Sequence, residues 1–131
     1  MTLKRFAFIL AGALALQGAV FAICYRDLLY LRGPVSEIVA APPERFVRHA
    51  THALGRRQLT AGHLETIASA AAALHQPSLE VRALQRRQEI DRTDRSVRLR
   101  LADALRRAGD YAQAEQIYLD LISSVSPEAE R

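Results

Sequence analysis

The chain contains little of what disulfide-bonded proteins and common enzymes require. It has one cysteine and no tryptophan in 131 residues. One cysteine excludes an intramolecular disulfide, so an exported domain would depend on packing alone. The sequence also lacks a glycine-rich phosphate loop, a Cys-x-x-Cys pair and a serine flanked by glycines in a nucleophile elbow. We therefore predict no enzyme activity, no catalytic residues and no cofactor.

Aromatic residues are scarce, at 6% of the chain. After residue 43 they are only Phe46, Tyr111 and Tyr118, all at positions expected on helix faces. Residues 44–131 contain 14 arginines and 12 acidic residues, so their charges nearly balance. Nucleic-acid-binding proteins combine clustered basic residues with stacking aromatics. We expect no nucleic-acid partner.

The histidines do not form a metal or catalytic pattern. His49 and His52 lie three residues apart on one predicted helix, and the nearby sequence offers no third ligand at a suitable spacing. Glu65 and Ser69 share a helix face, but no histidine is spaced to activate this serine. We expect surface histidines, no metal and no small-molecule substrate.

One long hydrophobic run is present, at the N-terminus. Lys4 and Arg5 precede residues 6–25, which contain a single strongly polar residue. At about 1.5 Å per residue, a helix of this length spans about 30 Å, the thickness of a bilayer's hydrocarbon core. The basic flank favours an N-terminus in the cytoplasm and the rest of the chain outside. Residues 1–31 are therefore predicted to be a transmembrane anchor or a signal peptide.

Both interpretations of this leader stay open. Leu28, Leu29 and Leu31 extend the hydrophobicity and favour an anchor, whereas the small residue Ala22 is suited to cleavage of a secretory signal. The first predicts a bacterial inner-membrane protein with a periplasmic domain, and the second a periplasmic protein. Residues 32–43, bracketed by Gly-Pro and Pro-Pro pairs, have no clear period and predict a semi-rigid linker.

The clearest pattern lies between residues 94 and 127. Leu101 and Leu105 lie four residues apart on one helical face. Gly109 suits the left-handed position that ends a helix. Asp110 can cap a following helix, with Gln113 at the capping-box spacing. The second helix has an apolar stripe formed by Ala114, Ile117, Tyr118, Leu121, Ile122 and Val125.

This hairpin resembles the tetratricopeptide repeat family. The matching residues are Leu101, Ala102, Leu105, Gly109, Asp110, Tyr111, Ala114 and Tyr118, with Pro127 near the family's closing proline. The chain departs from the family at Arg98 and Leu121, where large apolar and small residues are usual. The resemblance implies an all-α solenoid of helix pairs, in which the first helix of each pair lines a partner-binding groove.

A weaker copy precedes this hairpin by about 34 residues, the length of such a repeat. Its first helix ends near Leu74, its turn is formed by residues 75–77, and Ser78 can cap its second helix. Residues 43–57 resemble the last helix of a still earlier pair. We therefore expect a helical-hairpin domain of about five helices in residues 44–131, after one hydrophobic helix.

Two surfaces are predicted to bind a protein. The resemblance implies a groove that includes Glu65, Ser69, Arg100, Asp103 and Arg107. The other surface is the C-terminal end, where the last helix is apolar on more than one face, which normally indicates burial on more than one face. Its predicted contact residues are Ile117, Leu119 and Ile122.

The arginines between residues 92 and 107 predict either an ion-paired surface or an electropositive strip for an acidic partner or anionic lipids. The sequence as a whole predicts a small non-catalytic accessory or assembly subunit of a cell-envelope membrane complex, bound to a larger protein subunit. The alternative is a cleaved, secreted periplasmic peptide-binding module or secretion chaperone.

Overall fold

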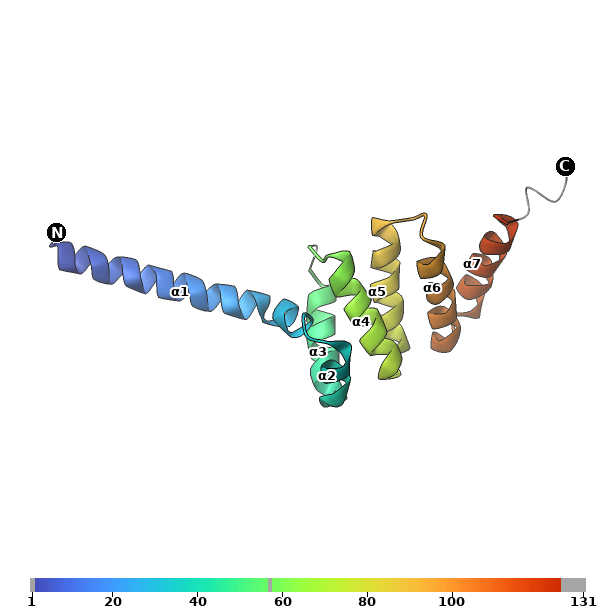
Figure 1. Cartoon of the computed structure of the whole chain (residues 1–131), viewed down its shortest axis with the longest axis horizontal. Helices are drawn as coiled ribbons and strands as arrows, with labels where there is room; N and C mark the ends of the chain where they lie inside the picture. The colour runs from blue at the N-terminus through green and yellow to red at the C-terminus, as the bar shows by residue number, and fades with distance from the viewer. Residues whose placement is uncertain (1, 57, 126–131) are drawn as a thin grey trace.

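The computed structural model describes residues 2–56 and 58–125, in which all regular structure is helical. The helices, shown in Figure 1, are α1 (Leu3–Tyr30), α2 (Val35–Ala40), α3 (Pro43–Leu54), α4 (Ala61–Ala73), α5 (Pro77–Ile90), α6 (Arg95–Ala108) and α7 (Tyr111–Ser123). The prediction of an all-α fold with one hydrophobic N-terminal helix is confirmed. Pro127, which lies near the position of the family's closing proline, is outside the described residues.

Helix α1 projects away from the other helices (Figure 1). Its segment Leu3–Ile23 is long and apolar enough to span a membrane or to act as a signal, and none of its most hydrophobic window is buried. The end of the helix differs, because Asp27 is 7% exposed and Leu31, the C-terminal cap, is 1% exposed. One continuous helix therefore leads from the hydrophobic span into the core of the domain.

Residues 32–43, predicted to be a linker, include helix α2. Pro34 is the N-cap of this helix, in an extended conformation. Ile38 is 3% exposed and belongs to the core, where α2 packs against α3 and α4. This helix was not predicted because six residues are too few for a periodic signal.

The remaining helices pack in chain order, α4 on α5, α5 on α6 and α6 on α7. Their starting points repeat: α6 begins at Arg95, 34 residues after Ala61 of α4. Likewise α7 begins at Tyr111, 34 residues after Pro77 of α5, and Pro77 follows Pro43 of α3 by the same interval. The prediction of five helices after residue 43 agrees with α3 to α7.

The turns of the two hairpins have the same geometry. His75 and Gly109 hold the left-handed position, with φ of 54° and 89°. Each is followed by a residue whose backbone N–H reaches back five residues, as in a Schellman motif. These bonds run from Gln76 to the Ala71 carbonyl at 2.8 Å and from Asp110 to the Leu105 carbonyl at 2.9 Å. The expected left-handed Gly109 is confirmed.

Of the two predicted helix caps, the one at Asp110 is confirmed and the one at Ser78 is wrong. The Asp110 carboxylate accepts a hydrogen bond from the Gln113 backbone N–H at 3.2 Å, as expected. Ser78, in contrast, does not cap α5, because Gln76 is the N-cap and Pro77 the first helical residue. Proline is favoured at this first position because its missing N–H would have no partner within the helix.

Candidate partner-binding surface

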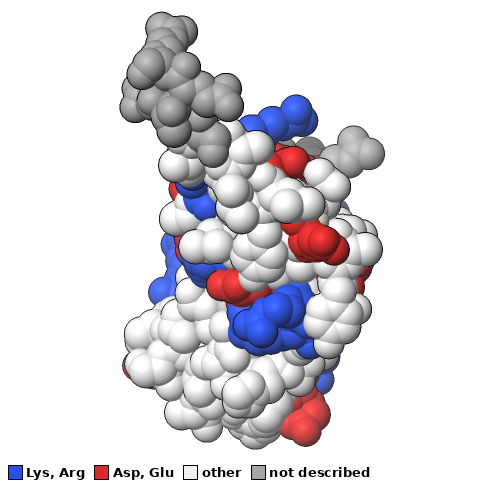
Figure 2. Space-filling model, turned by 90° about the vertical axis from the view of Figure 1, so that its right-hand side faces the viewer, with Lys and Arg blue, Asp and Glu red and all other residues white. Residues whose placement is uncertain are grey.

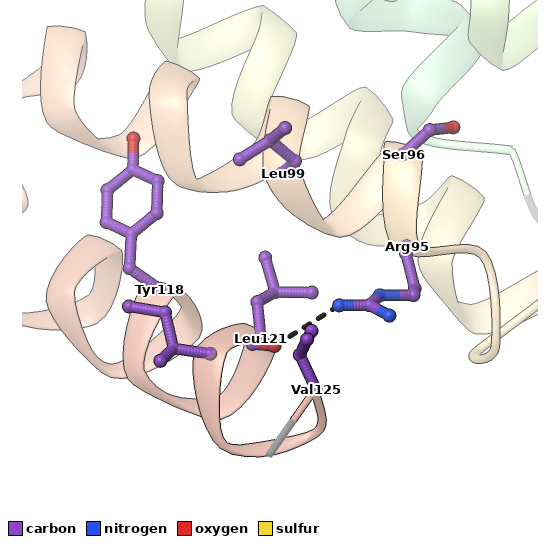
Figure 3. Close-up of a pocket in the computed structure, with 7 residues that line it drawn as sticks. Arg95, Ser96, Leu99, Tyr118, Leu121 and Val125 are labelled. Carbon is purple, nitrogen blue, oxygen red and sulfur yellow. Dashed lines mark hydrogen bonds between the residues drawn. The ribbon is translucent and has the colours of Figure 1, made fainter. Parts of the chain in front are cut away.

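A groove of about 530 Å³ lies between α6 and α7, at the end of the array farthest along the chain (Figure 3). Leu99 lines it from α6, and Tyr118 and Leu121 line it from α7. Ile122 and Val125 continue this lining. At one edge, the Arg95 guanidinium donates a hydrogen bond to the Leu121 backbone carbonyl at 3.2 Å, the dashed line in Figure 3. The groove is therefore apolar with one cationic edge.

Most of the hydrophobic surface of α7 is not buried in the part of the chain that the structure describes. Only Ala114 and Leu121 are buried on this helix. The exposed large hydrophobic residues at this end are Tyr111 (68%), Leu119 (53%), Ile122 (64%) and Val125 (62%). Figure 2, which faces this end, shows mostly uncharged surface, interrupted by a band where acidic and basic side chains adjoin. Contiguous apolar surface of this kind marks interaction sites.

The preceding hairpin is polar at four of the five positions equivalent to the apolar lining of the groove, the exception being Leu84, which corresponds to Tyr118. Equivalent positions of the two hairpins are 34 residues apart, the same interval as that between the helix starts. Leu99, Leu121, Ile122 and Val125 correspond to Glu65, Arg87, Gln88 and Asp91. The packing of a hairpin therefore does not require apolar residues at these four positions. The apolar groove is specific to the last hairpin.

The charged residues predicted to line a binding groove form ion pairs and hydrogen bonds with side chains of neighbouring helices. The Glu65 carboxylate lies 2.7 Å from the Arg100 guanidinium and 3.5 Å from that of Arg87. Arg87 also lies 3.6 Å from Asp94. This network joins α4, α5 and the start of α6. The half-buried Ser69 lies one turn farther along α4.

Two further contacts join α6 to its neighbours. Arg107 donates a hydrogen bond to Glu80 at 2.9 Å, and Glu80 is 3% exposed. The Tyr118 hydroxyl donates a hydrogen bond to the Asp103 carboxylate, which raises the pKa of this tyrosine above its usual value. Arg100, Asp103 and Arg107 are thus engaged in bonds between helices, and none of them lines the α6–α7 groove. Of the other predicted contact residues, Ile117 is partly buried, whereas Leu119 and Ile122 are exposed.

A polar cluster at the junction of α1 and α3 was missed in the sequence. The buried His49, predicted to lie on the surface, places its Nδ1 atom 2.5 Å from Oδ1 of Asp27. His52 and Arg56 each lie 3.8 Å from the other carboxylate oxygen. The Tyr30 ring stacks on His49 with centroids 4.3 Å apart. The sequence signal for this cluster was Asp27, an acidic residue just after the hydrophobic span and one helical turn before Leu31.

The described residues contain no group of three or more His, Cys, Asp or Glu side chains that could hold a metal ion. No protein-family model, curated protein or solved structure matches this chain. Its function therefore has to be inferred from the geometry of the chain itself.

Proposed function

We propose that this chain is a small, membrane-anchored, non-catalytic accessory or assembly subunit of a cell-envelope complex. Its tetratricopeptide-like domain, placed on the periplasmic side of a bacterial inner membrane, holds a larger protein subunit. The 34-residue spacing of the helix starts and the two equivalent turns support this repeat class. Repeat arrays of this kind act by presenting surfaces to partners.

The observation that supports partner binding most directly is the apolar groove of the last hairpin. Its Leu99, Ile122 and Val125 are 48–64% exposed, and the equivalent residues of the preceding hairpin are polar. Fully burying one such side chain contributes about 1.5–3 kcal/mol. The partner surface that fits best is an amphipathic helix with an apolar stripe, because successive helices already pack in this way from α4 to α7.

The continuity of α1 supports retention of the anchor. The helix passes through Ala22 without a break, and Asp27, five residues later, is already buried. Cleavage after Ala22 would have to occur within a helix, close to the packed domain. The intact mass of the mature protein shows whether residues 1–22 are retained. Loss of residues 1–22 would support the secreted peptide-binding module or chaperone instead.

A pair of double variants tests the partner surface. Leu119→Glu/Ile122→Glu places two charges on the exposed face of α7, whereas Gln85→Glu/Gln88→Glu places the same charges at the equivalent positions of α5. After purification of the full chain in mild detergent, a partner in constant stoichiometry should be lost from the first variant and kept by the second. Circular dichroism should show equal helical content in both.

Two results would contradict the proposed function. One is a wild-type chain that purifies as a monomer, with no partner in constant stoichiometry and with these side chains exposed. The other is equal loss of the partner from both double variants, because that would assign the effect to added charge and not to the apolar face.

A further inference from the structure

A second hollow, also of about 530 Å³, lies where α1 meets α3. Helix α1 contributes Arg26, Leu29 and Tyr30, and α3 contributes Arg45, Arg48 and His49. Three arginines from two helices therefore line one concave surface. We call it the junction pocket.

The arginines of the junction pocket differ from five of those in the rest of the domain. Within the described residues, Arg26, Arg45 and Arg48 form no ion pair. In contrast, ion pairs to carboxylates engage Arg56, Arg87, Arg98, Arg100 and Arg107. The pocket is therefore a concentration of positive charge that the domain does not neutralise.

Acidic groups near the pocket do not cancel this charge. The buried Asp27 carboxylate is directed to His49, with His52 and Arg56 nearby. Glu44, beside Arg45 on α3, is exposed and forms no ion pair in the described part of the chain. An anion entering the pocket would thus meet free guanidinium groups.

Tyr30 supplies an independent observation. Its hydroxyl is buried and has no hydrogen-bond partner among the described residues. Its ring lies between His49, on which it stacks, and the Arg45 guanidinium, 5.5 Å from the ring centroid. Buried hydroxyl groups in proteins normally have a partner. An anion in the pocket would pair with the Arg45 guanidinium beside this ring.

If α1 spans a membrane, the junction pocket begins in the lipid headgroup layer at Arg26 and extends beyond that layer at Tyr30. Arg26 and Tyr30 lie three and seven residues beyond Ile23, the end of the apolar span. These intervals correspond to roughly 5 and 10 Å along a helix. The headgroup layer extends about 5–7 Å beyond the hydrocarbon core. In Figure 1, α1 leaves the array at the α2–α3 end, opposite α7, so this end faces the membrane.

We propose that the junction pocket binds the phosphate of an anionic phospholipid headgroup, held by Arg26, Arg45 and Arg48. The guanidinium groups form charge-assisted hydrogen bonds to the phosphate oxygens. The bound lipid fixes the domain against the bilayer surface. This inference rests on the retained anchor of the proposed function.

Native mass spectrometry of the full-length chain in detergent tests the site, with phosphatidylglycerol and phosphatidylcholine in equal amounts. The wild type should retain one phosphatidylglycerol in preference to phosphatidylcholine. Each arginine near a membrane surface strengthens the binding of anionic lipid about fivefold, so Arg45→Gln/Arg48→Gln should weaken it about 25-fold. The matched control is Arg82→Gln/Arg92→Gln, which removes two exposed arginines that form no ion pair in the described residues. It should keep the preference.

Inorganic phosphate at millimolar concentration forms the second arm of the experiment. If it binds as tightly as phosphatidylglycerol and through the same arginines, the ligand is a soluble phosphate and the lipid assignment is overturned. Equal retention of the two lipids by the wild type also overturns it, and needs no variant. The same spectra report whether residues 1–22 are present. Loss of lipid preference in a chain of full mass therefore rejects this site and leaves the accessory-subunit function standing.

Discussion

Gly109 and His75 occupy the same left-handed position in the two hairpin turns, with φ of 89° and 54°. A Cβ atom at Gly109 would meet nothing within 4 Å, so the effect of a substitution there comes from the backbone alone. We expect Gly109→Ala to destabilise the domain by about 1 kcal/mol and His75→Gly to stabilise it by up to about 1 kcal/mol. Thermal unfolding of the full chain in detergent measures both.

Gly62→Ala is the control for this pair. Gly62 lies in the first turn of α4, where a Cβ would make only an ordinary contact with the Thr60 hydroxyl at 3.7 Å. Alanine should therefore stabilise this helix by about 0.5–1 kcal/mol. If Gly109→Ala raised the unfolding temperature as well, the left-handed conformation of the second turn would be wrong.

Glu80 is a buried acid at a position that is otherwise apolar. The equivalent residues of α3 and α7 are Phe46 and Ala114, and all three are buried. We expect Arg107→Ala to destabilise the domain by about 1–2 kcal/mol, because it leaves the Glu80 carboxylate unpaired. Because the Arg107 side chain is 46% exposed, solvent screens this ion pair, and the loss of stability should be near the lower end of the range.

Replacement of the acid should have a different effect. Glu80→Met keeps the volume and removes the charge, so its free energy of unfolding should equal or exceed that of the wild type. Urea unfolding compares the two single variants with Glu80→Met/Arg107→Ala, which should resemble Glu80→Met alone. Equal destabilisation by both single variants would indicate that the pair itself stabilises the fold.

At the scale of one helix, the start of α6 predicts a pH dependence. The Ser96 hydroxyl and the Val97 N–H donate to the Asp94 carboxylate, which lowers its pKa below the usual 3.8. A carboxylate with a lowered folded-state pKa stabilises the protein above its unfolded pKa, and this stabilisation is lost as the pH falls through the folded value. Stability should therefore decline below about pH 4.

Asp94→Asn checks this origin of the acid sensitivity. Asparagine still caps the helix but does not titrate, so the unfolding temperature of the variant should fall less between pH 5 and pH 2. Asp91 has its pKa lowered by Thr93 in the same loop, and Asp91→Asn/Asp94→Asn should flatten the profile further. An unchanged profile in the double variant would exclude these two carboxylates as the cause.

The same scale shows what sequence patterns can predict. Helices α6 and α7 followed from the spacing of Leu101 and Leu105 and from the residues of the turn, because these signals are local. The pairing of Glu65 with Arg100 was not predictable, because it depends on how α4 and α6 pack. The many apolar residues of α7 were recognisable in the sequence. Their polar equivalents in α5 could be compared with them only after the helix starts of the two hairpins had been aligned. The bond between Asp27 and His49 joins two segments that the sequence assigned to different units.

At the scale of the whole molecule, the apolar span of α1, which is the membrane anchor of the proposed function, lies at the opposite end of the array from the candidate partner surface (Figure 1). Helix α1 enters beside α3, and the apolar groove lies at α7. A partner bound there would be held away from the bilayer by the intervening helices. The packed end of α1 makes this separation depend on a rigid junction and not on a flexible linker.

Truncation tests how far the domain extends. A chain that begins at residue 25 lacks the apolar span but keeps Asp27, Leu31 and Ile38, so it should unfold cooperatively in urea. A chain limited to the predicted domain 44–131 loses the core side chains of Leu31 and Ile38, which are 1% and 3% exposed. It also leaves the buried His49 without Asp27. Loss of one such side chain costs about 2–5 kcal/mol. The shorter chain should therefore be less stable by at least about 4 kcal/mol. Equal unfolding midpoints would place the domain boundary at residue 44 and make the junction dispensable.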